Sequence, residues 1–394
     1  SLLVMLTQDD CKQAAFSTTW AAINGRPLSD TYYYNAVQMR GGDMPPDTYE
    51  LGKTLGSTDG AGNEVRFSFT TTLAPESSYM EQEITVDPGY TENYYRFFMQ
   101  AGLVWGNVTE MANYGVGIAF HNLDTASENV VDSLRSHYEI AQRLIREHLA
   151  GRGCKMLAEP DGNKTYVEAA RLYAPIQTVV LQQGGEILRP FAVEDDLTGR
   201  LIERTFAEPA ALRERIAAQM ARPASEREAV SIGVHGTDRS WADFLLWLND
   251  TCGQDGDDCV WMPSHEEYFE YNYLRRHASV TMAVDGKRVT IRVSMPGGLY
   301  FYYPSLSLSV RGVPASGCRA VDAGPMVTGL SWGASGDGSL LVNFDCRHAL
   351  GDLAEHFVEL YENDPSEANL ADARYFVGKL RPSDRKTALL RRLN

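Results

Sequence analysis

From residue 1 to about 276, short apolar runs alternate with helix-like segments along the chain. Asp132–Leu149 carries apolar residues at helical spacing, and Pro209–Met220 is rich in the helix-forming residues Ala, Arg and Glu. This alternation is typical of parallel strands joined by helices, so the sequence predicts an α/β fold, with an α/β barrel as the natural candidate. The predicted strands are Leu2–Leu6, Arg66–Thr71, Gly117–Phe120, Lys155–Ala158, Thr178–Leu181, Ser231–Val234 and Cys259–Met262.

Three further segments interrupt or follow this pattern. Residues 20–64 are polar, contain several Gly and Pro residues, and are too long for an ordinary barrel connection, so we expect them to cap one face. Residues 277–349 predict a small β-sandwich, and residues 350–394 predict helices broken near Asp364-Pro365 and Arg381-Pro382. The strands expected in the sandwich are Ser279–Ala283, Arg288–Ser294, Leu299–Tyr303, Leu306–Val310 and Leu340–Phe344.

The composition limits the classes of partner. The chain has 394 residues, of which 44% are hydrophobic, enough for sizeable cores and two or three domains. Acidic residues outnumber basic ones by 52 to 36, and the formal net charge of -16 makes nucleic acid and anionic membrane poor partners. A neutral or cationic substrate fits this charge better. The 20 Tyr and 6 Trp residues suit stacking on sugar rings, but they suit large cores equally well.

No apolar stretch has the length of a membrane-spanning helix, and the chain enters the first predicted strand without a basic region or cleavage motif. We interpret it as an exported protein whose signal peptide has been removed, and expect a secreted, periplasmic or cell-surface location. In that setting Cys252 with Cys259, and Cys318 with Cys346, are candidate disulfide partners. A cysteine metal site is not expected, because no C-x-x-C spacing occurs.

Two adjacent carboxylates, Asp9 and Asp10, follow the first predicted strand. Neighbouring acids repel each other unless a cation, a proton or a hydrogen-bond network separates their protonation states, and carbohydrate hydrolases use that separation. Asp is also common in turns and helix caps after strands. Because the pair alone favours a turn, a catalytic interpretation requires partners elsewhere in the chain.

Three motif-like segments do not supply these partners. Gly329–Gly333 matches the G-x-S-x-G pattern of serine hydrolases, but a turn and another strand follow it instead of a helix. Gly52-Lys53-Thr54 lacks the first glycine of a phosphate-binding loop, since residue 47 is Asp. His265-Glu266 begins like a zinc-protease helix, but Phe269 stands where the second histidine is required.

Polar residues at the ends of later predicted strands are better partners. His121 directly follows the third predicted strand, with Asp124 three residues later, and His235 directly follows the sixth. Active sites of α/β barrels draw their residues from several strand carboxyl ends. A single histidine at a strand end is more often structural, but the shared placement and order of these residues favour a common site.

At these positions the sequence resembles the polysaccharide deacetylase family, carbohydrate esterase family 4, whose members adopt a distorted (β/α) barrel with a divalent metal site. The first family motif, Thr-Phe-Asp-Asp-Gly, is matched by Thr7–Cys11 with Phe and Gly replaced. The other matches are Gly115, Ile118 and His121 in the second motif, Val234-His235 in the fifth, and Trp261–Arg276 in the closing segment. The resemblance covers residues 1–276 and leaves the remainder unexplained.

The resemblance implies a role for each matched residue. Asp9 would be the general base, Asp10 and His121 would be metal ligands, and His235 would protonate the leaving amine. The resemblance further implies that the substrate is an N-acetylated or O-acetylated glycan. It also implies a divalent metal ion as the cofactor, with zinc favoured. A divalent ion lowers the pKa of its bound water while a carboxylate and an imidazole supply base and acid, so the roles are chemically coherent.

The sequence departs from the family pattern at two places. Thr125 stands where the family has its second metal histidine, and we expect Asp124 to ligate in its place, with His265 as a further candidate. Ala158 stands where the family has an arginine that orients the catalytic aspartate.

Lys155 and Lys164 are the candidates to replace that arginine, although the spacing selects neither. These departures keep two alternatives open. One is a non-catalytic carbohydrate-binding protein derived from the deacetylase fold, and the other is a glycan hydrolase of different linkage specificity.

Overall fold

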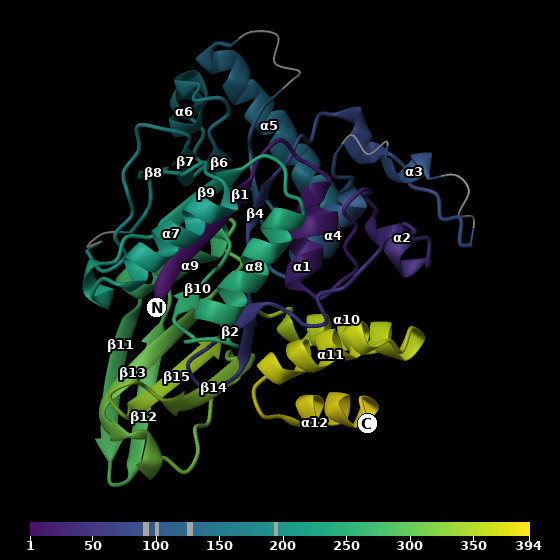
Figure 1. Cartoon of the computed structure of the whole chain (residues 1–394). Helices are drawn as coiled ribbons and strands as arrows, with labels where there is room; N and C mark the ends of the chain where they lie inside the picture. Colours follow the sequence, from purple (N-terminus) through teal and green to yellow (C-terminus); the bar gives the residue numbers. More distant parts are fainter. Residues whose placement is uncertain (90–93, 99–101, 124–128, 193–195) are drawn as a thin grey trace. The chain divides into compact units, whose positions relative to one another are not determined.

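The computed structural model of the chain describes residues 1–89, 94–98, 102–123, 129–192 and 196–394 (Figure 1). These residues form two compact units. The α/β unit comprises residues 1–57 and 66–268, and the C-terminal unit comprises residues 58–65 and 269–394. No helix in the described ranges is long and apolar enough to cross a membrane.

Parallel strands form the centre of the α/β unit. β1 (Leu2–Gln8) is buried along its whole length and pairs in parallel with β4, β9 and β10, while β4 pairs with β5. A second parallel sheet has the order β6-β7-β8. Single parallel bridges, Phe120 with Leu157 and Thr205 with Ile232, link the two sheets. The strand bounds are β4 (Thr70–Thr72), β5 (Gly117–Ala119), β6 (Met156–Ala158), β7 (Thr178–Leu181), β8 (Leu201–Glu203), β9 (Val230–Val234) and β10 (Val260–Trp261).

Amphipathic helices connect these strands. In α5 (Val131–His148) the buried residues Leu134, Tyr138, Ala141 and Ile145 recur at intervals of three and four, so one face of the helix packs on the core. A stretch of π-helix, Ala15–Trp20, is buried throughout. The other helices are α1 (Ala21–Ile23), α2 (Ala36–Arg40), α3 (Tyr95–Phe98), α4 (Trp105–Asn113), α6 (Lys164–Arg171), α7 (Pro209–Met220), α8 (Arg239–Cys252) and α9 (His265–His277).

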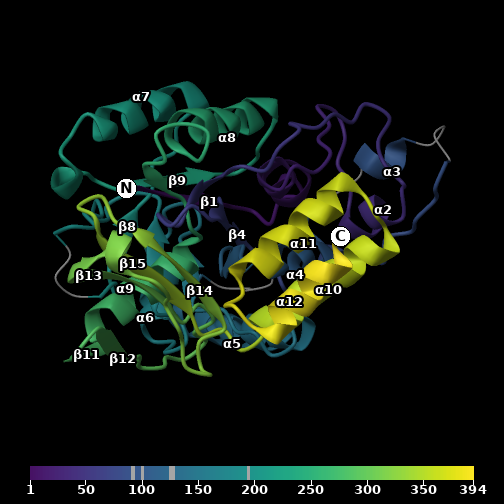
Figure 2. The ribbon, with the colours of Figure 1, turned by 90° about the horizontal axis from the view of Figure 1, so that it is seen from below.

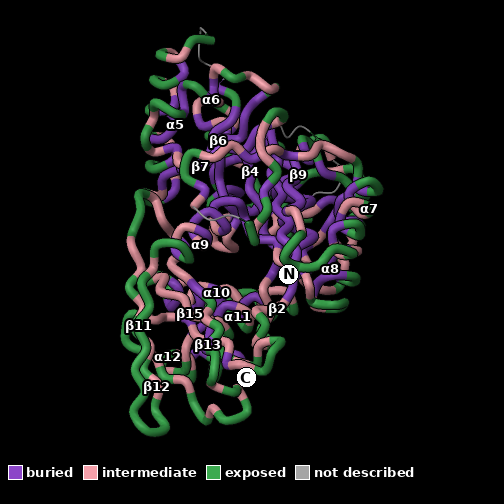
Figure 3. The backbone as a smooth tube through the Cα atoms, turned by 90° about the vertical axis from the view of Figure 1, so that its left-hand side faces the viewer, coloured by how far each residue is buried: buried purple, intermediate pink, exposed green. Residues whose placement is uncertain are grey.

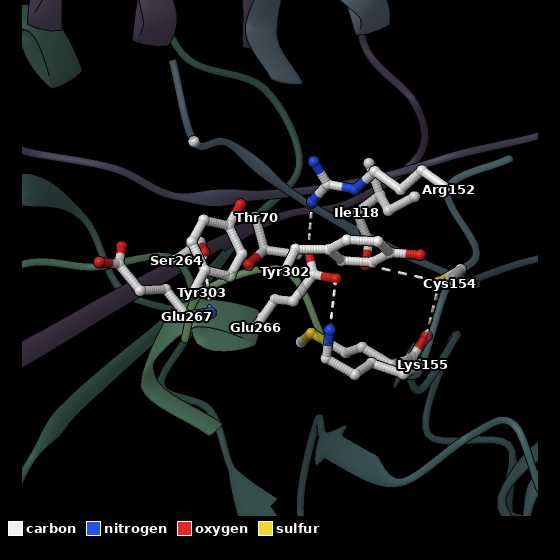
Figure 4. Close-up of polar contacts among 12 residues, drawn as sticks. Thr70, Ile118, Arg152, Cys154, Lys155, Ser264, Glu266, Glu267, Tyr302 and Tyr303 are labelled. Carbon is white, nitrogen blue, oxygen red and sulfur yellow. Dashed lines mark hydrogen bonds and ion pairs between the residues drawn. The ribbon is translucent and has the colours of Figure 1, made fainter. Parts of the chain in front are cut away.

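Most strand residues of the α/β unit are buried, whereas the hairpin of β11 (Ser279–Asp285) and β12 (Arg288–Ser294) in the C-terminal unit is largely exposed (Figure 3). A buried ion cluster also lies in the α/β unit. Glu266, in the first turn of α9, accepts hydrogen bonds from Lys155 Nζ (2.7 Å) and Arg152 Nη2 (2.5 Å), as Figure 4 shows. The side chains of Glu266 and Lys155 have no exposed area. The cluster therefore attaches the start of α9 to the segment that enters β6.

The C-terminal unit contains antiparallel sheets, most of α9, and the helices α10 to α12. β11 (Ser279–Asp285) pairs with β12 (Arg288–Ser294), and a second sheet has the order β13-β15-β14. Ile291 of β12 packs on a small apolar cluster formed by Val310, Leu340 and Val342 of the second sheet. The helices α10 to α12 pack on one another (Figure 2). The remaining bounds are β2 (Gly56–Thr58), β3 (Glu64–Arg66), β13 (Ser305–Pro314), β14 (Gly329–Ala334), β15 (Ser339–Asp345), α10 (Leu350–Asn363), α11 (Glu367–Lys379) and α12 (Asp384–Arg392).

The structure confirms the mixed α/β class with parallel strands, and it corrects several elements. The predicted strand Leu299–Tyr303 does not form, because the carboxylate of Glu270 accepts the backbone N–H groups of Tyr302 and Tyr303. The predicted strand Arg66–Thr71 is divided, since β3 ends at Arg66 and β4 begins at Thr70. The β-sandwich is present in part, as two antiparallel sheets that share an apolar cluster.

The expected disulfides are absent from the structure. All six cysteines lie in the described ranges, and all six are free thiols. Cys318 Sγ instead lies 3.6 Å from the carbonyl oxygen of Ala320. The pairs Cys252 with Cys259 and Cys318 with Cys346 are therefore not bonded.

Candidate active site

The end of β1 places Asp9 and Asp10 in different surroundings. The N–H of Asp9 donates to the carbonyl of Val234 (2.7 Å), which continues the pairing of β1 with β9, and the Asp9 side chain is only 2% exposed. Asp10 has a φ of 62°, in the left-handed region that Asp tolerates better than most residues, and its side chain is 41% exposed. The turn therefore buries one carboxylate and leaves the other accessible.

His121 approaches Asp10 from the end of β5. Its Nε2 atom lies 3.3 Å from Asp10 Oδ1, and its Nδ1 atom lies 2.8 Å from the carbonyl oxygen of Ala158. A carbonyl can only accept, so Nδ1 carries a proton and the ring orientation is fixed. Nε2 is then the atom that faces the exposed carboxylate.

This contact shifts the pKa values of both Asp10 and His121. The hydrogen bond from His121 lowers the pKa of Asp10, despite the opposing effect of burial, and the charges of Lys12 and His235 add to the decrease. Burial acts to lower the pKa of His121, but the hydrogen bond to Asp10, the charge of Asp9 and the Ala158 carbonyl outweigh it, so the pKa of His121 is raised. The negative charge of Asp9 and Asp10 at the end of β1 thus favours the protonated form of His121.

Arg204 is the partner of Asp9, and the sequence did not reveal it. Its Nη1 atom donates to Asp9 Oδ1 (2.6 Å), and its Nη2 atom donates to the carbonyl of Glu159 (3.2 Å). Both side chains of the Arg204–Asp9 pair are almost fully buried. The guanidinium therefore fixes the orientation of the Asp9 carboxylate.

Sequence reasoning missed Arg204 because it missed β8, which has three residues of which two are only partly buried. The available signal was the apolar pair Leu201-Ile202 shortly before the arginine. The two lysines considered for this role contact other groups: Lys155 binds Glu266, and Lys164 donates to Glu159 (2.6 Å).

His235 follows β9 and is exposed. Its ring lies 5.4 Å from the ring of Phe206, which follows β8, and the Arg204 guanidinium lies 5.0 Å from the same Phe206 ring. The charge of His235 adds a small contribution to the lowered pKa of Asp10. The end of β8 therefore supports both Asp9 and His235.

Replacing Gly233 by Ala is expected to disturb this support. A Cβ atom at Gly233 would lie 2.3 Å from the Phe206 ring, so the ring must move. We expect a loss of about 1–3 kcal/mol in the free energy of unfolding, measured by urea denaturation. Gly236→Ala is the matched control, because a Cβ there meets nothing within 4 Å. Equal stability of the two variants would contradict the packing of Phe206 on Gly233.

The sequence also predicted Asp124 and His265 as metal ligands, and only His265 lies in the described residues. Asp124 and Thr125 lie outside the described ranges. His265 is buried, its Nε2 atom lies 2.8 Å from Thr178 Oγ1, and burial with the nearby Arg204 charge lowers its pKa to about 4. His265 is thus a neutral core residue, and the expectation that it approaches the metal site is not supported.

The whole chain matches one protein family. The model of the family described as "Putative polysaccharide deacetylase" matches residues 1–394. The chain belongs to this family. A search of curated proteins gives no match. Membership in the deacetylase family confirms the resemblance seen in the motifs, and the match also includes residues 277–394, which the motifs left unexplained.

For a member of the deacetylase family, the described residues fit a divalent ion in part. Asp10 supplies an accessible carboxylate, and His121 presents a ring nitrogen whose partner nitrogen is held by a backbone carbonyl, as is usual for metal-binding histidines. Across the described ranges, no group of three or more His, Cys, Asp or Glu side chains is arranged to hold a metal ion. These ranges therefore offer two candidate donors, Asp10 and His121.

Proposed function

We propose that the chain is a metal-dependent hydrolase that removes acetyl groups from an N-acetylated or O-acetylated glycan. The observation that carries the proposal is the 3.3 Å approach of Asp10 Oδ1 and His121 Nε2 beside the buried pair of Asp9 and Arg204. Family membership supports the reaction class.

The arrangement of strands supports the barrel that the motifs led us to expect. Ladder pairings and the two single bridges run from β1 through β4, β5, β6, β7, β8 and β9 and back to β1. We propose that this path is a distorted (β/α) barrel. Asp9, His121, Arg204 and His235 each follow a strand of the path, as residues of a barrel active site do.

Each residue has a proposed task. Asp9, oriented by Arg204, takes a proton from the attacking water, and exposed His235 gives a proton to the leaving group. Asp10 and His121 would hold the divalent ion, with Asp124 proposed as a third ligand. The ion would supply a lowered pKa for its bound water and polarisation of the acyl oxygen.

A non-catalytic carbohydrate-binding protein is the second candidate. It is favoured by the absence of a three-donor group in the described ranges. Metal binding separates the two candidates, because the hydrolase needs the ion and the binding protein does not.

The test measures metal content and melting temperature of the purified protein with and without added zinc, nickel or cobalt. We expect the native protein to be stabilised, by about 2.7 kcal/mol at a free metal concentration 100 times the Kd. Asp10→Ala and His121→Ala should lose this stabilisation.

His137→Ala is the matched control for the metal test. His137 lies in α5 of the same unit, where its Nδ1 atom contacts Glu76 (2.8 Å), so its removal deletes a histidine–carboxylate pair outside the site. Native protein that neither carries a divalent ion nor gains stability from one would refute the metal-dependent hydrolase.

A further inference from the structure

Gln8, the last residue of β1, is fully buried although its side chain is an amide. Side chains alternate along a strand, so Gln8 lies on the same side of β1 as Val4 and Leu6, which belong to the hydrophobic core. A buried amide costs free energy unless its hydrogen bonds are made. The partners of Gln8 therefore show what a polar side chain does at this position.

The Gln8 amide bonds to the segment that carries His235. Its Nε2 atom donates to Thr237 Oγ1 (3.2 Å) and, at a longer distance, to the carbonyl of His235 (3.5 Å). A carbonyl can only accept, so the amide orientation is fixed, and its Oε1 atom accepts from the hydroxyl of Thr19 (2.8 Å). Thr237 Oγ1 lies 2.9 Å from Thr19 Oγ1 and 3.2 Å from the carbonyl oxygen of Ala14. The three side chains thus form a closed hydrogen-bond network.

The network joins three separate segments of the α/β unit. Gln8 belongs to β1, Thr19 to the π-helix Ala15–Trp20, and Thr237 to the turn between β9 and α8. A π-helix is rare and often occurs at a functional site. Because Asp9 follows Gln8 directly, the network links the backbone beside the proposed base to the backbone of the proposed acid, His235.

We propose that Gln8 is a positioning residue, which holds His235 where it can protonate the leaving group. This assignment rests on the proposed function of the site. The His235 side chain is exposed, so its reach depends on its backbone, which the bonds from Gln8 to His235 and Thr237 hold. A displacement of about 1 Å is enough to reduce a rate roughly 100-fold.

The test compares two acetyl donors with the full chain. An amine or a sugar hydroxyl needs a proton in order to leave, whereas 4-nitrophenolate leaves 4-nitrophenyl acetate without one. Gln8→Met keeps an unbranched side chain of similar length and removes the amide. We expect kcat for an acetylated oligosaccharide to fall roughly 100-fold at unchanged KM, and kcat for 4-nitrophenyl acetate to stay the same.

Gln142→Met is the matched control. Gln142 is a buried glutamine of α5, and its amide bonds to both the N–H and the carbonyl of Cys154 at 2.8 Å. This variant also loses buried hydrogen bonds, but it should leave the ratio of the two rates unchanged. An equal loss of both activities in Gln8→Met, or no loss of either, would overturn the assignment.

A second pair of variants decides the question if Gln8→Met does not fold. Thr237→Val removes the hydroxyl that Gln8 binds and keeps the shape of the side chain, so it should show the same selective loss. Thr237→Ser keeps the hydroxyl and should retain activity on the acetylated oligosaccharide. Equal activity of the two Thr237 variants on this substrate would contradict the network.

Nuclear magnetic resonance of protein labelled with ¹⁵N-histidine separates this assignment from the proposed function. The chain has 8 His residues, and His235→Asn identifies the His235 signal. In Gln8→Met we expect this signal to shift and its order parameter to fall from ~0.85 to below ~0.6. An unchanged signal would overturn the assignment even in an active enzyme. A changed signal without acetate release by the native protein would reject the deacetylase and leave Gln8 as the anchor of His235.

Discussion

Asp9→Asn is expected to reduce acetate release from an acetylated oligosaccharide by at least ~100-fold. The amide cannot take a proton from water, although its oxygen can still accept the hydrogen bond that Arg204 donates to Asp9 Oδ1. The measurement is the initial rate of acetate release, with kcat and KM determined separately. We expect the loss in kcat, because the base acts on the attacking water and not on sugar binding.

The stability of this variant must be checked in parallel. Neutralising Asp9 leaves the buried Arg204 guanidinium without its charge partner, which destabilises the fold. The assay is therefore run below the melting temperature, with near-ultraviolet circular dichroism confirming native packing. Arg204→Lys keeps the charge but loses the planar geometry, so it should be less impaired than Asp9→Asn. Full activity of Asp9→Asn would remove Asp9 as the base.

Glu266→Gln is expected to lower the free energy of unfolding by about 3–5 kcal/mol, because it removes the buried negative charge that both Lys155 and Arg152 bind. Urea denaturation near neutral pH measures this loss. Glu267→Gln is the matched control, since it makes the same change at the next residue, and Figure 4 shows the Glu267 side chain directed away from Lys155. Equal destabilisation by the two variants would contradict the role of the buried cluster.

The cluster also predicts a pH dependence of stability. Burial acts to raise the pKa of Glu266, but the charges of Arg152 and Lys155 outweigh it and hold the pKa below its ordinary value of 4.5. A carboxyl group with a lowered pKa in the folded state stabilises the protein above its unfolded-state pKa, and this contribution is lost as pH falls through the folded-state pKa. The difference in stability between native protein and Glu266→Gln should therefore shrink as pH falls below about 4.5, as measured by urea denaturation at a series of pH values. A difference that stays constant down to the acid-unfolding pH would contradict the cluster.

The sequence predicted the parts of the site that depend on strand ends. β1 is an uninterrupted apolar run, so the position of Asp9 and Asp10 after it followed directly from the pattern. His121 and His235 follow β5 and β9, and parallel strands bring their carboxyl ends to one edge of the sheet. The approach of His121 to Asp10 could therefore be predicted from the sequence alone.

The parts that the sequence did not predict depend on contacts between distant segments. Arg204 reaches Asp9 across 195 positions of sequence, from a strand too short to show a pattern. The buried pair of Lys155 and Glu266 spans 111 positions, and neither residue type is expected in a core. The strand expected at Leu299–Tyr303 is absent because of another contact between separate segments. The backbone N–H groups of Tyr302 and Tyr303 donate to the side chain of Glu270 instead of to a neighbouring strand.

The most direct test of the proposed metal-dependent deacetylation is acetate release by protein freed of metal with a chelator and then titrated with zinc. Before zinc is added, the account predicts no acetate release from N-acetylated or O-acetylated oligosaccharides. As zinc is added, acetate release by the native protein should rise and then saturate. His121→Ala should not show this zinc-dependent rise. Release that is unaffected by the chelator, or no release from any acetylated glycan after zinc is restored, would contradict it.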